Sequence, residues 1–164
     1  MNKLSTLYDE NYGAWAKRTV DLLKAGEFSP LDIDHLVEEL EDMGKSEQRE
    51  LENRLRVLLS HLLKWQYQYL QLSERWKDFE GKDWKNTITI QRTEINIHLR
   101  KYPGVGQFLP GITVEAYQDA RELAAEETDL LIDIFPTTCP YTQQQILNKS
   151  FYPAMKEMVM CKKG

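Results

Sequence analysis

One stretch decides the fold: LENRLRVLLSHLLKWQYQYL, which occupies residues 51–70 of the 164-residue chain. Its large apolar side chains recur in steps of four and three residues, at Leu51, Leu55, Leu58, Leu62, Trp65 and Tyr69. This spacing aligns them on one side of an α-helix, as in the seam of a coiled coil. No proline or glycine interrupts the pattern, so we predict one long helix from about Lys45 to Leu70.

Helical periodicity extends over most of the remaining sequence. We predict further helices at about Asp9–Ala25, Pro30–Met43, Trp84–Tyr102, Thr113–Thr128 and Gln143–Asn148. Gly44 either ends the second of these or lets two helices meet closely, and the polar residues from Ser73 to Asp83 indicate a connection. The predicted fold class is all-α, a helical bundle of about five main helices with a short C-terminal helix.

The length and composition are those of one ordinary folded domain. With 164 residues and 41% hydrophobic side chains, the chain can bury a core without disulfides or a metal. We therefore predict a single helical domain over residues 1–153. Residues 154–164 form a tail that frays or extends as a helix carrying Met155, Met158 and Met160.

Several classes of protein are excluded by simple features of the sequence. No apolar run approaches the roughly 18 residues of a membrane span, and Met1–Thr6 lacks the apolar stretch of a signal peptide. The two cysteines, Cys139 and Cys161, form no CxxC pair and have no histidine nearby in the sequence. These features predict a cytoplasmic protein whose cysteines are packed rather than nucleophilic.

The net charge of −5 conceals an uneven distribution. Residues 1–53 carry 6 basic and 13 acidic side chains, residues 54–102 carry 10 and 5, and residues 103–164 carry 5 and 8. A basic middle between acidic flanks is typical of helices that complement one another in one bundle, and it also fits an anion-binding face.

Several ionisable residues fall on or beside the apolar faces of the predicted helices at about 100° per residue. They are Glu39, Glu47, Arg54, His61, His98 and Glu127. Buried charges are costly unless they are paired. We therefore expect a structural polar cluster with hydrogen-bonded histidines, in which Arg54 pairs with Glu47, Glu39 or Glu127.

A metal site is the alternative interpretation of the same residues. Glutamate and histidine that project inward from several helices build the di-metal sites of helical bundles, and the candidates here are Glu39, His61, His98 and Glu127. The Glu-x-x-His motif of such sites is absent from the sequence. The main expectation is therefore that no cofactor is needed, and a bound metal is kept as the alternative.

The basic middle also contains aromatic residues that the apolar seam does not use. Tyr67, Trp76 and Phe79 are the candidates for an exposed protein interface, where aromatic side chains are enriched. Aromatic residues among cations also bind single-stranded nucleic acid by stacking and phosphate contact. The sequence pI of about 5.3 is acidic, which favours a protein partner over nucleic acid.

Six stretches carry a resemblance to a known family. They are Leu7–Tyr12, Trp15–Ala16, His35–Glu47, Leu62–Gln66, Ala120–Thr128 and Phe135–Thr142. Over about Leu7 to Pro153 the chain resembles domain-of-unknown-function family 29, a mostly helical bacterial family that is abundant in cyanobacteria. The resemblance implies a helical fold in a bacterial cell and no reaction or catalytic residues, and the tail after Pro153 adds to the family pattern.

The expected function is that of a non-enzymatic cytoplasmic module for protein interaction or regulation. It rests on the absence of a reaction motif together with the aromatic helix ends and the uneven charge. A metal-binding bundle protein or enzyme using inward glutamate and histidine is one alternative, and a nucleic-acid-associated protein is another. We expect an unidentified protein partner and no membrane contact, and a homo-oligomer formed through the long helix is also compatible with the sequence.

Overall fold

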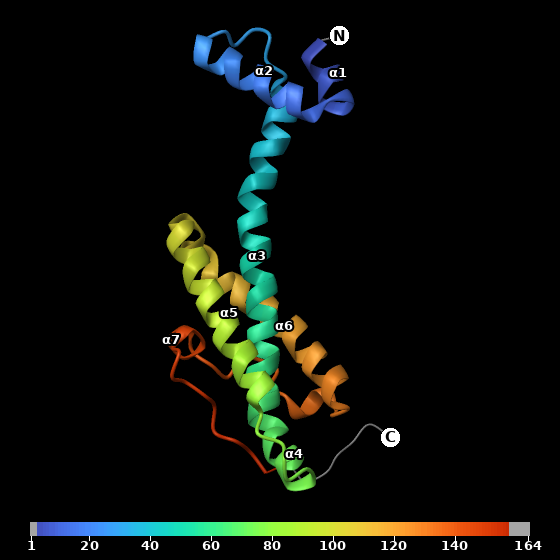
Figure 1. The fold of residues 1–164 in the computed structure, drawn as a ribbon, viewed down its shortest axis with the longest axis vertical. Helices are drawn as coiled ribbons and strands as arrows, with labels where there is room; N and C mark the ends of the chain where they lie inside the picture. Colours follow the sequence, from blue (N-terminus) through green and yellow to red (C-terminus); the bar gives the residue numbers. More distant parts are fainter. Residues whose placement is uncertain (1–2, 158–164) are drawn as a thin grey trace. The chain divides into compact units, whose positions relative to one another are not determined.

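The computed structural model describes residues 3–157, and in that range the chain is all-α with no strand, as predicted (Figure 1). The elements in chain order are α1 (Lys3–Glu10), α2 (Tyr12–Ala25), α3 (Ile33–Tyr67), α4 (Tyr69–Arg75), α5 (Lys82–Lys101), the 3-10 helix η1 (Pro103–Phe108), α6 (Leu109–Thr128), the 3-10 helix η2 (Ile132–Ile134) and α7 (Gln143–Leu147). The chain divides into two compact units, residues 1–46 and residues 47–164. The prediction of a single domain over residues 1–153 stays a prediction.

The first unit begins with two helices where the sequence predicted one. The amide oxygen of Asn11 accepts a hydrogen bond from the Ala14 backbone N–H at 3.1 Å, which caps a new helix. The predicted helix from Asp9 to Ala25 is therefore wrong at its start. The predicted end of this helix at Ala25 is confirmed. Gly26 follows it as the C-cap, with a left-handed φ of 71° and its backbone N–H bonded to the carbonyl oxygens of Leu22 and Leu23.

α3 differs from the prediction at Pro30, where a helix was expected to begin, and at Gly44, where it was expected to end or to meet another helix. It begins at Ile33, because Ser29 and Pro30 lie in a turn that precedes the helix. It also runs through Gly44 without a break, and a methyl group added there would touch nothing in the described chain. Gly44 thus neither ends a helix nor makes room for a neighbour.

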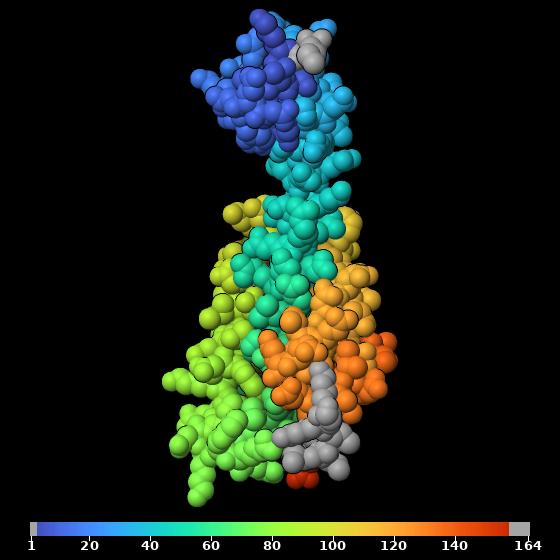
Figure 2. All heavy atoms as spheres, turned by 90° about the vertical axis from the view of Figure 1, so that its right-hand side faces the viewer, coloured from blue at the N-terminus to red at the C-terminus, as the bar shows by residue number. Residues whose placement is uncertain are grey.

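The second unit is built around the leucine seam. The predicted seam residues Leu51, Leu55, Leu58 and Leu62 are fully buried, and Leu59 and Leu63, which the seam did not include, are fully buried as well. Trp65 and Tyr69 are only half-buried. α5 and α6 lie along this part of α3 (Figures 1 and 2). α5 contributes Ile88 and Ile95, and α6 contributes small alanines that let helices approach closely.

The connection before α5 is partly helical and ends in a turn that requires glycine. α4 (Tyr69–Arg75) occupies the start of the predicted connection. Gly81 precedes α5 with a φ of 64°, and a Cβ there would collide with the ring of Tyr69. Both the conformation and the close approach therefore require glycine at this position.

The C-terminal segment is attached by a capped helix and a buried arginine. Thr142 and Gln145 form a capping box that begins α7 at Gln143, where the predicted short helix also begins. Arg92 is fully buried and donates to the carbonyl oxygens of Gln145, Ile146 and Phe151 at 2.7–3.2 Å. Residues 154–157 are not helical, against the predicted extension through Met155, and Met158, Met160 and Cys161 lie outside the described residues.

Candidate functional site

Arg54 is paired, although with different glutamates from those predicted. Its guanidinium donates to Glu50 Oε1 at 3.1 and 3.2 Å and lies 3.7 Å from Glu94 Oε2. The side chain keeps 28% of its surface exposed. The pairing expected with Glu47, Glu39 or Glu127 is wrong. Glu50 lies one turn before Arg54 on the same helix, which places its carboxylate next to the guanidinium.

The other predicted members of the polar cluster have separate partners. His61 Nδ1 lies 2.8 Å from its own helix carbonyl at Val57, and burial lowers the pKa of this imidazole. Glu127 accepts a hydrogen bond from Lys64 at 2.6 Å. Glu39 belongs to the first unit, where it binds two tyrosines. Among the described residues, the structure does not gather Glu39, His61, His98 and Glu127 into one set of metal ligands.

A different group of possible metal ligands does come together, and two of its three members, Glu47 and His98, belong to the predicted polar cluster. Glu47, Glu50 and His98 each offer a ligand atom within 4.8 Å of the others. His98 is buried, and its Nε2 lies 2.8 Å from the carbonyl oxygen of Glu47. Glu50 was missed by the sequence analysis, and its position three residues after Glu47 was the available signal.

In the first unit, Glu39 joins α3 to the two preceding helices. Tyr8 donates to its Oε1 at 2.5 Å and Tyr12 donates to its Oε2 at 2.7 Å. These hydrogen bonds favour the charged carboxylate, so the pKa of Glu39 is lowered while the pKa values of both tyrosines are raised. The structural role expected for Glu39 thus involves hydroxyl groups rather than Arg54.

A second polar contact in the first unit was not predicted. The buried carboxylate of Asp32 accepts from Trp15 Nε1 at 3.1 Å and lies 2.5 Å from His35 Nδ1. The His35 ring stacks on Tyr8 with a centroid distance of 3.9 Å. The hydrogen bond to Asp32 raises the pKa of His35. The spacing of Asp32 and His35 at the start of a helix was the signal for this pair.

The first three turns of α3 also carry apolar side chains on the surface. They are Ile33, Val37, Leu40 and Met43, which we call the apolar stripe. The residues of this stripe recur in steps of four and three, so they share one side of the helix. His35, which stacks on Tyr8, and Glu39, which accepts from the hydroxyl groups of Tyr8 and Tyr12, lie on a different side of α3. The structure therefore leaves a continuous apolar face exposed on this unit.

Acidic residues accompany the apolar stripe. Asp34, Glu38 and Glu41 are exposed, and each directly follows a residue of the stripe in the sequence. Among the described residues, none of the three forms an ion pair within 4.0 Å. We call these three residues the acidic row. By sequence, residues 1–46 carry 5 basic and 10 acidic side chains, whereas residues 47–164 carry 16 of each. The net negative charge of the chain thus belongs to the first unit.

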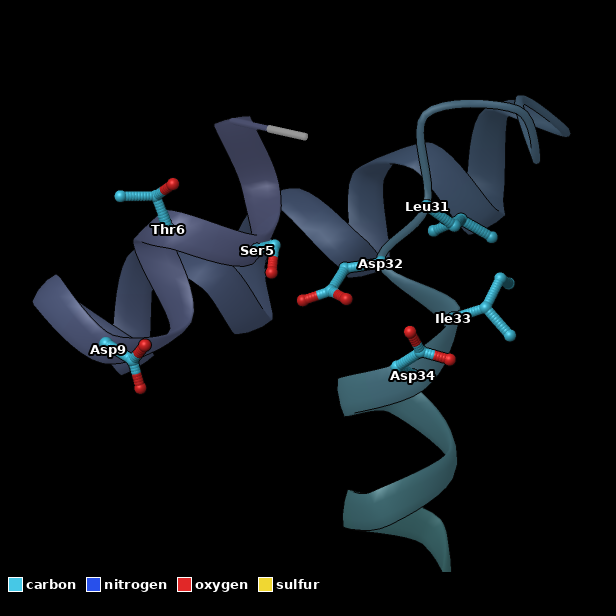
Figure 3. A pocket seen from close by; sticks show the side chains of 7 residues that line it. All are labelled: Ser5, Thr6, Asp9, Leu31, Asp32, Ile33 and Asp34. Atoms are coloured by element: carbon cyan, nitrogen blue, oxygen red, sulfur yellow. The ribbon is translucent and has the colours of Figure 1, made fainter. Parts of the chain in front are cut away.

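A surface hollow adds to this acidic character. It is lined by Ser5, Thr6 and Asp9 of α1 and by the segment from Leu31 to Asp34. Figure 3 shows the carboxylates of Asp9, Asp32 and Asp34 around it, with no basic side chain among the lining residues, and shows Ile33 directed away from α1. The hollow and the acidic row thus share the start of α3.

The predicted aromatic interface is only partly exposed. Tyr67 is buried and packs edge-on against Phe135, so its assignment to a surface is wrong. Phe79 is half-buried between Tyr69 and Trp84. Trp76 is 58% exposed and stays an interface candidate.

Comparison with known proteins identifies a family. The model of the family described as "Domain of unknown function DUF29" matches residues 7–152, which is most of the chain. No curated protein and no solved structure matches the chain. Among the described residues, none of the helices is long and apolar enough to cross a membrane.

Proposed function

The chain belongs to the DUF29 family, and because that membership names no ligand or reaction, we propose a function from its own surface. The first unit is a docking module for a basic, amphipathic helix of another protein. A single observation carries this proposal: on α3, the exposed apolar stripe runs beside the acidic row.

The apolar stripe supports recognition of a helix. Ile33, Val37 and Leu40 are each about half exposed, and their spacing confines them to roughly 60° of the helix circumference. A contiguous exposed apolar face of this kind marks an interaction site. A partner helix reads such a face through its own side chains at three- and four-residue spacing.

The acidic row sets the charge of the partner. Asp34, Glu38 and Glu41 lie along one edge of the stripe, so a helix docked there meets them with its flanking residues. Lysine or arginine at those positions relieves the mutual repulsion of the carboxylates and speeds the encounter. The partner is therefore apolar on one face and basic beside it.

The same charges argue against a second copy of this chain as the occupant. Two apolar stripes packed together bring two acidic rows into one interface, and like charges at an interface oppose association. The first unit has 5 basic side chains against 10 acidic ones, so two copies also repel each other through their net negative charge. Self-association through the stripe is thus an outcome that the experiment can reveal, and it would contradict the proposal.

The test uses the full chain and two designed helical peptides with the same leucine pattern, one rich in lysine and one in glutamate. We expect fluorescence anisotropy to show binding of the lysine peptide only, weakening as salt is added. Val37→Glu should reduce the affinity at least about tenfold, since it places a charge in the stripe. The matched control is Val114→Glu, because Val114 is exposed to a similar degree, 60% against 47%, on α6 of the second unit.

Equal losses in the two valine variants would contradict the proposal, as would wild-type protein that fails to bind the lysine peptide. Sedimentation at increasing protein concentration then separates docking from self-association. A dimer that Val37→Glu dissociates would replace the external partner by a second copy. The cellular partner should be recovered with wild-type protein and lost with Val37→Glu.

A further inference from the structure

We propose that the second unit binds a divalent transition-metal ion between α3 and α5, through Glu47, Glu50 and His98. A ligand atom from each of the three lies within 4.8 Å of the other two. Two carboxylates and one imidazole are donors that Zn²⁺, Fe²⁺ and Mn²⁺ accept. This site lies in a different unit from the docking surface, so the two proposals stand independently.

His98 is oriented as a metal ligand is. Its side chain is 4% exposed, and Nε2 lies 2.8 Å from the carbonyl oxygen of Glu47. A carbonyl oxygen only accepts, so Nε2 carries a hydrogen and the neutral ring has its lone pair on Nδ1. Ligating histidines are held by this kind of hydrogen bond from the other ring nitrogen, which sets the tautomer and the ring orientation.

The lone-pair nitrogen faces a carboxylate without a hydrogen bond between them. His98 Nδ1 lies 3.6 Å from Glu50 Oε2, and no hydrogen-bond partner of Nδ1 is found among the described residues. Both atoms accept hydrogen bonds and neither carries a hydrogen to donate, so they cannot bond to each other directly. A cation placed between the two atoms satisfies both.

Glu50 is itself positioned by a neighbour. Arg54 occupies Glu50 Oε1 with two N–H groups, which leaves Oε2 directed at His98. The two N–H groups share this single oxygen, so the contact fixes the position of Oε1 and leaves Oε2 without a hydrogen bond from Arg54. Arg54 thus acts as a positioning residue that holds one oxygen and leaves the other for a ligand.

Glu47 completes the set from the same side of α3. It lies three residues before Glu50, so both carboxylates emerge on one face of the helix, and its Oε2 is 3.7 Å from His98 Nε2. Donors around a tetrahedral zinc ion are about 3.3 Å apart. Both glutamate side chains are partly exposed, 27% and 48%, so they can rotate towards the Nδ1 lone pair while His98 stays fixed. Glu47, whose carboxylate lies beside the N–H of Nε2, has to rotate further than Glu50, which already faces Nδ1.

The experiment titrates metal-free, full-length protein with Co²⁺, follows the visible absorption, and then displaces the cobalt with Zn²⁺. We expect one saturable site. Glu50→Gln and His98→Gln should each weaken binding by more than tenfold, and Arg54→Met by about tenfold, as partners of ligands do. His61→Gln is the matched control, because this histidine is bonded to its own helix and lies outside the group.

Absence of saturable Co²⁺ and Zn²⁺ binding by the wild-type protein overturns the proposal, and the cluster is then an ion-pair network alone. Unchanged affinity in Glu50→Gln overturns it equally, since the metal then binds elsewhere. Circular dichroism of the metal-free variants checks their folding. Should His98→Gln fail to fold, the half-exposed Glu50 still provides the test.

Discussion

The two units of this chain are stabilised by different kinds of contact. The second unit buries a row of leucines and isoleucines between α3, α5 and α6. The first unit buries few apolar side chains, among them Leu4, Trp15 and Leu31, and it joins its helices through two carboxylates, Glu39 and Asp32. A short segment has too little surface to bury for a large core, so hydrogen bonds and aromatic stacking define its geometry.

The comparison also separates stability from recognition. The leucine seam of the second unit is buried in its core, whereas the apolar stripe of the first unit remains on the surface beside the acidic row. Substitutions of apolar residues should therefore change a different property of the protein in each unit. In the second unit they should change the free energy of unfolding, and in the first they should change binding.

The largest effect is expected from Leu58→Ala in the core of the second unit. Leu58 is fully buried, so its truncation should lower the free energy of unfolding by about 3 kcal/mol. Leu40→Ala in the apolar stripe should change it by less than about 0.5 kcal/mol. Urea unfolding followed by circular dichroism measures both, and similar losses in the two variants would erase the contrast between the units.

Arg92→Met should have the next largest effect. The substitution leaves three backbone carbonyl oxygens without their donor, which we expect to cost about 2–3 kcal/mol. Limited proteolysis should also cleave residues 148–157 faster, because the arginine attaches the segment around α7. Arg100→Met, an exposed change on the same helix, is the control, and equal cleavage in both variants would show that Arg92 does not hold this segment.

A smaller and pH-dependent effect should distinguish the two units through their histidines. The folded-state pKa of His35 is raised above 6.5, so its contact with Asp32 stabilises fully below pH 6.5 and is lost as the pH rises through the raised value. The folded-state pKa of His61 is lowered, so its protonation destabilises the protein as the pH falls below 6.5.

Melting temperatures of wild type, His35→Gln and His61→Gln measured across this range give the test. The deficit of His35→Gln should be largest in acid and should shrink in alkali. The variant His61→Gln should instead lose less stability than wild type on acidification. Parallel curves for the three proteins would mean that neither histidine titrates with a shifted pKa.

The smallest effect is expected from Arg54→Ala in metal-free protein. A fully buried pairing predicted from the helix wheel would make this change cost about 3 kcal/mol. The structure shows partners that are 48% and 43% exposed, and exposed ion pairs contribute less than about 1 kcal/mol. Unfolding in low and high salt checks this, and a salt-independent loss near 3 kcal/mol would place Arg54 in the core after all.

The helix content and the seam were predictable because they depend on local periodicity. The spacing along one helix is enough to place Leu51, Leu55, Leu58 and Leu62 on one face, however the neighbouring helices pack. Arg92 shows the limit of the same method. It lies between Ile88 and Ile95 on the inward face of α5, yet a charged residue is read as surface unless its partners are known, and here they are backbone carbonyl oxygens more than 50 residues away.

The candidate sites divide in the same way. Glu47 and His98 were chosen from the sequence because they lie near apolar helix faces, whereas the contact between Glu50 and His98 Nδ1 depends on the packing of α5 on α3. Periodicity alone would assign Ile33, Leu40 and Met43 of the apolar stripe, together with Leu36, to an inward face, because these residues share one side of the helix. The side that packs on α1 and α2 carries His35 and Glu39 instead.

By itself the sequence determined that this protein is helical, where its main seam lies, and that its acidic charge is concentrated towards the N-terminus, since these properties depend on residue type and short-range spacing. Only the tertiary structure decided which polar atoms meet and which apolar faces stay exposed. Both outcomes depend on contacts between residues far apart in the chain. Periodicity shows that a helix has an apolar face, whereas only packing shows whether another part of the protein covers it.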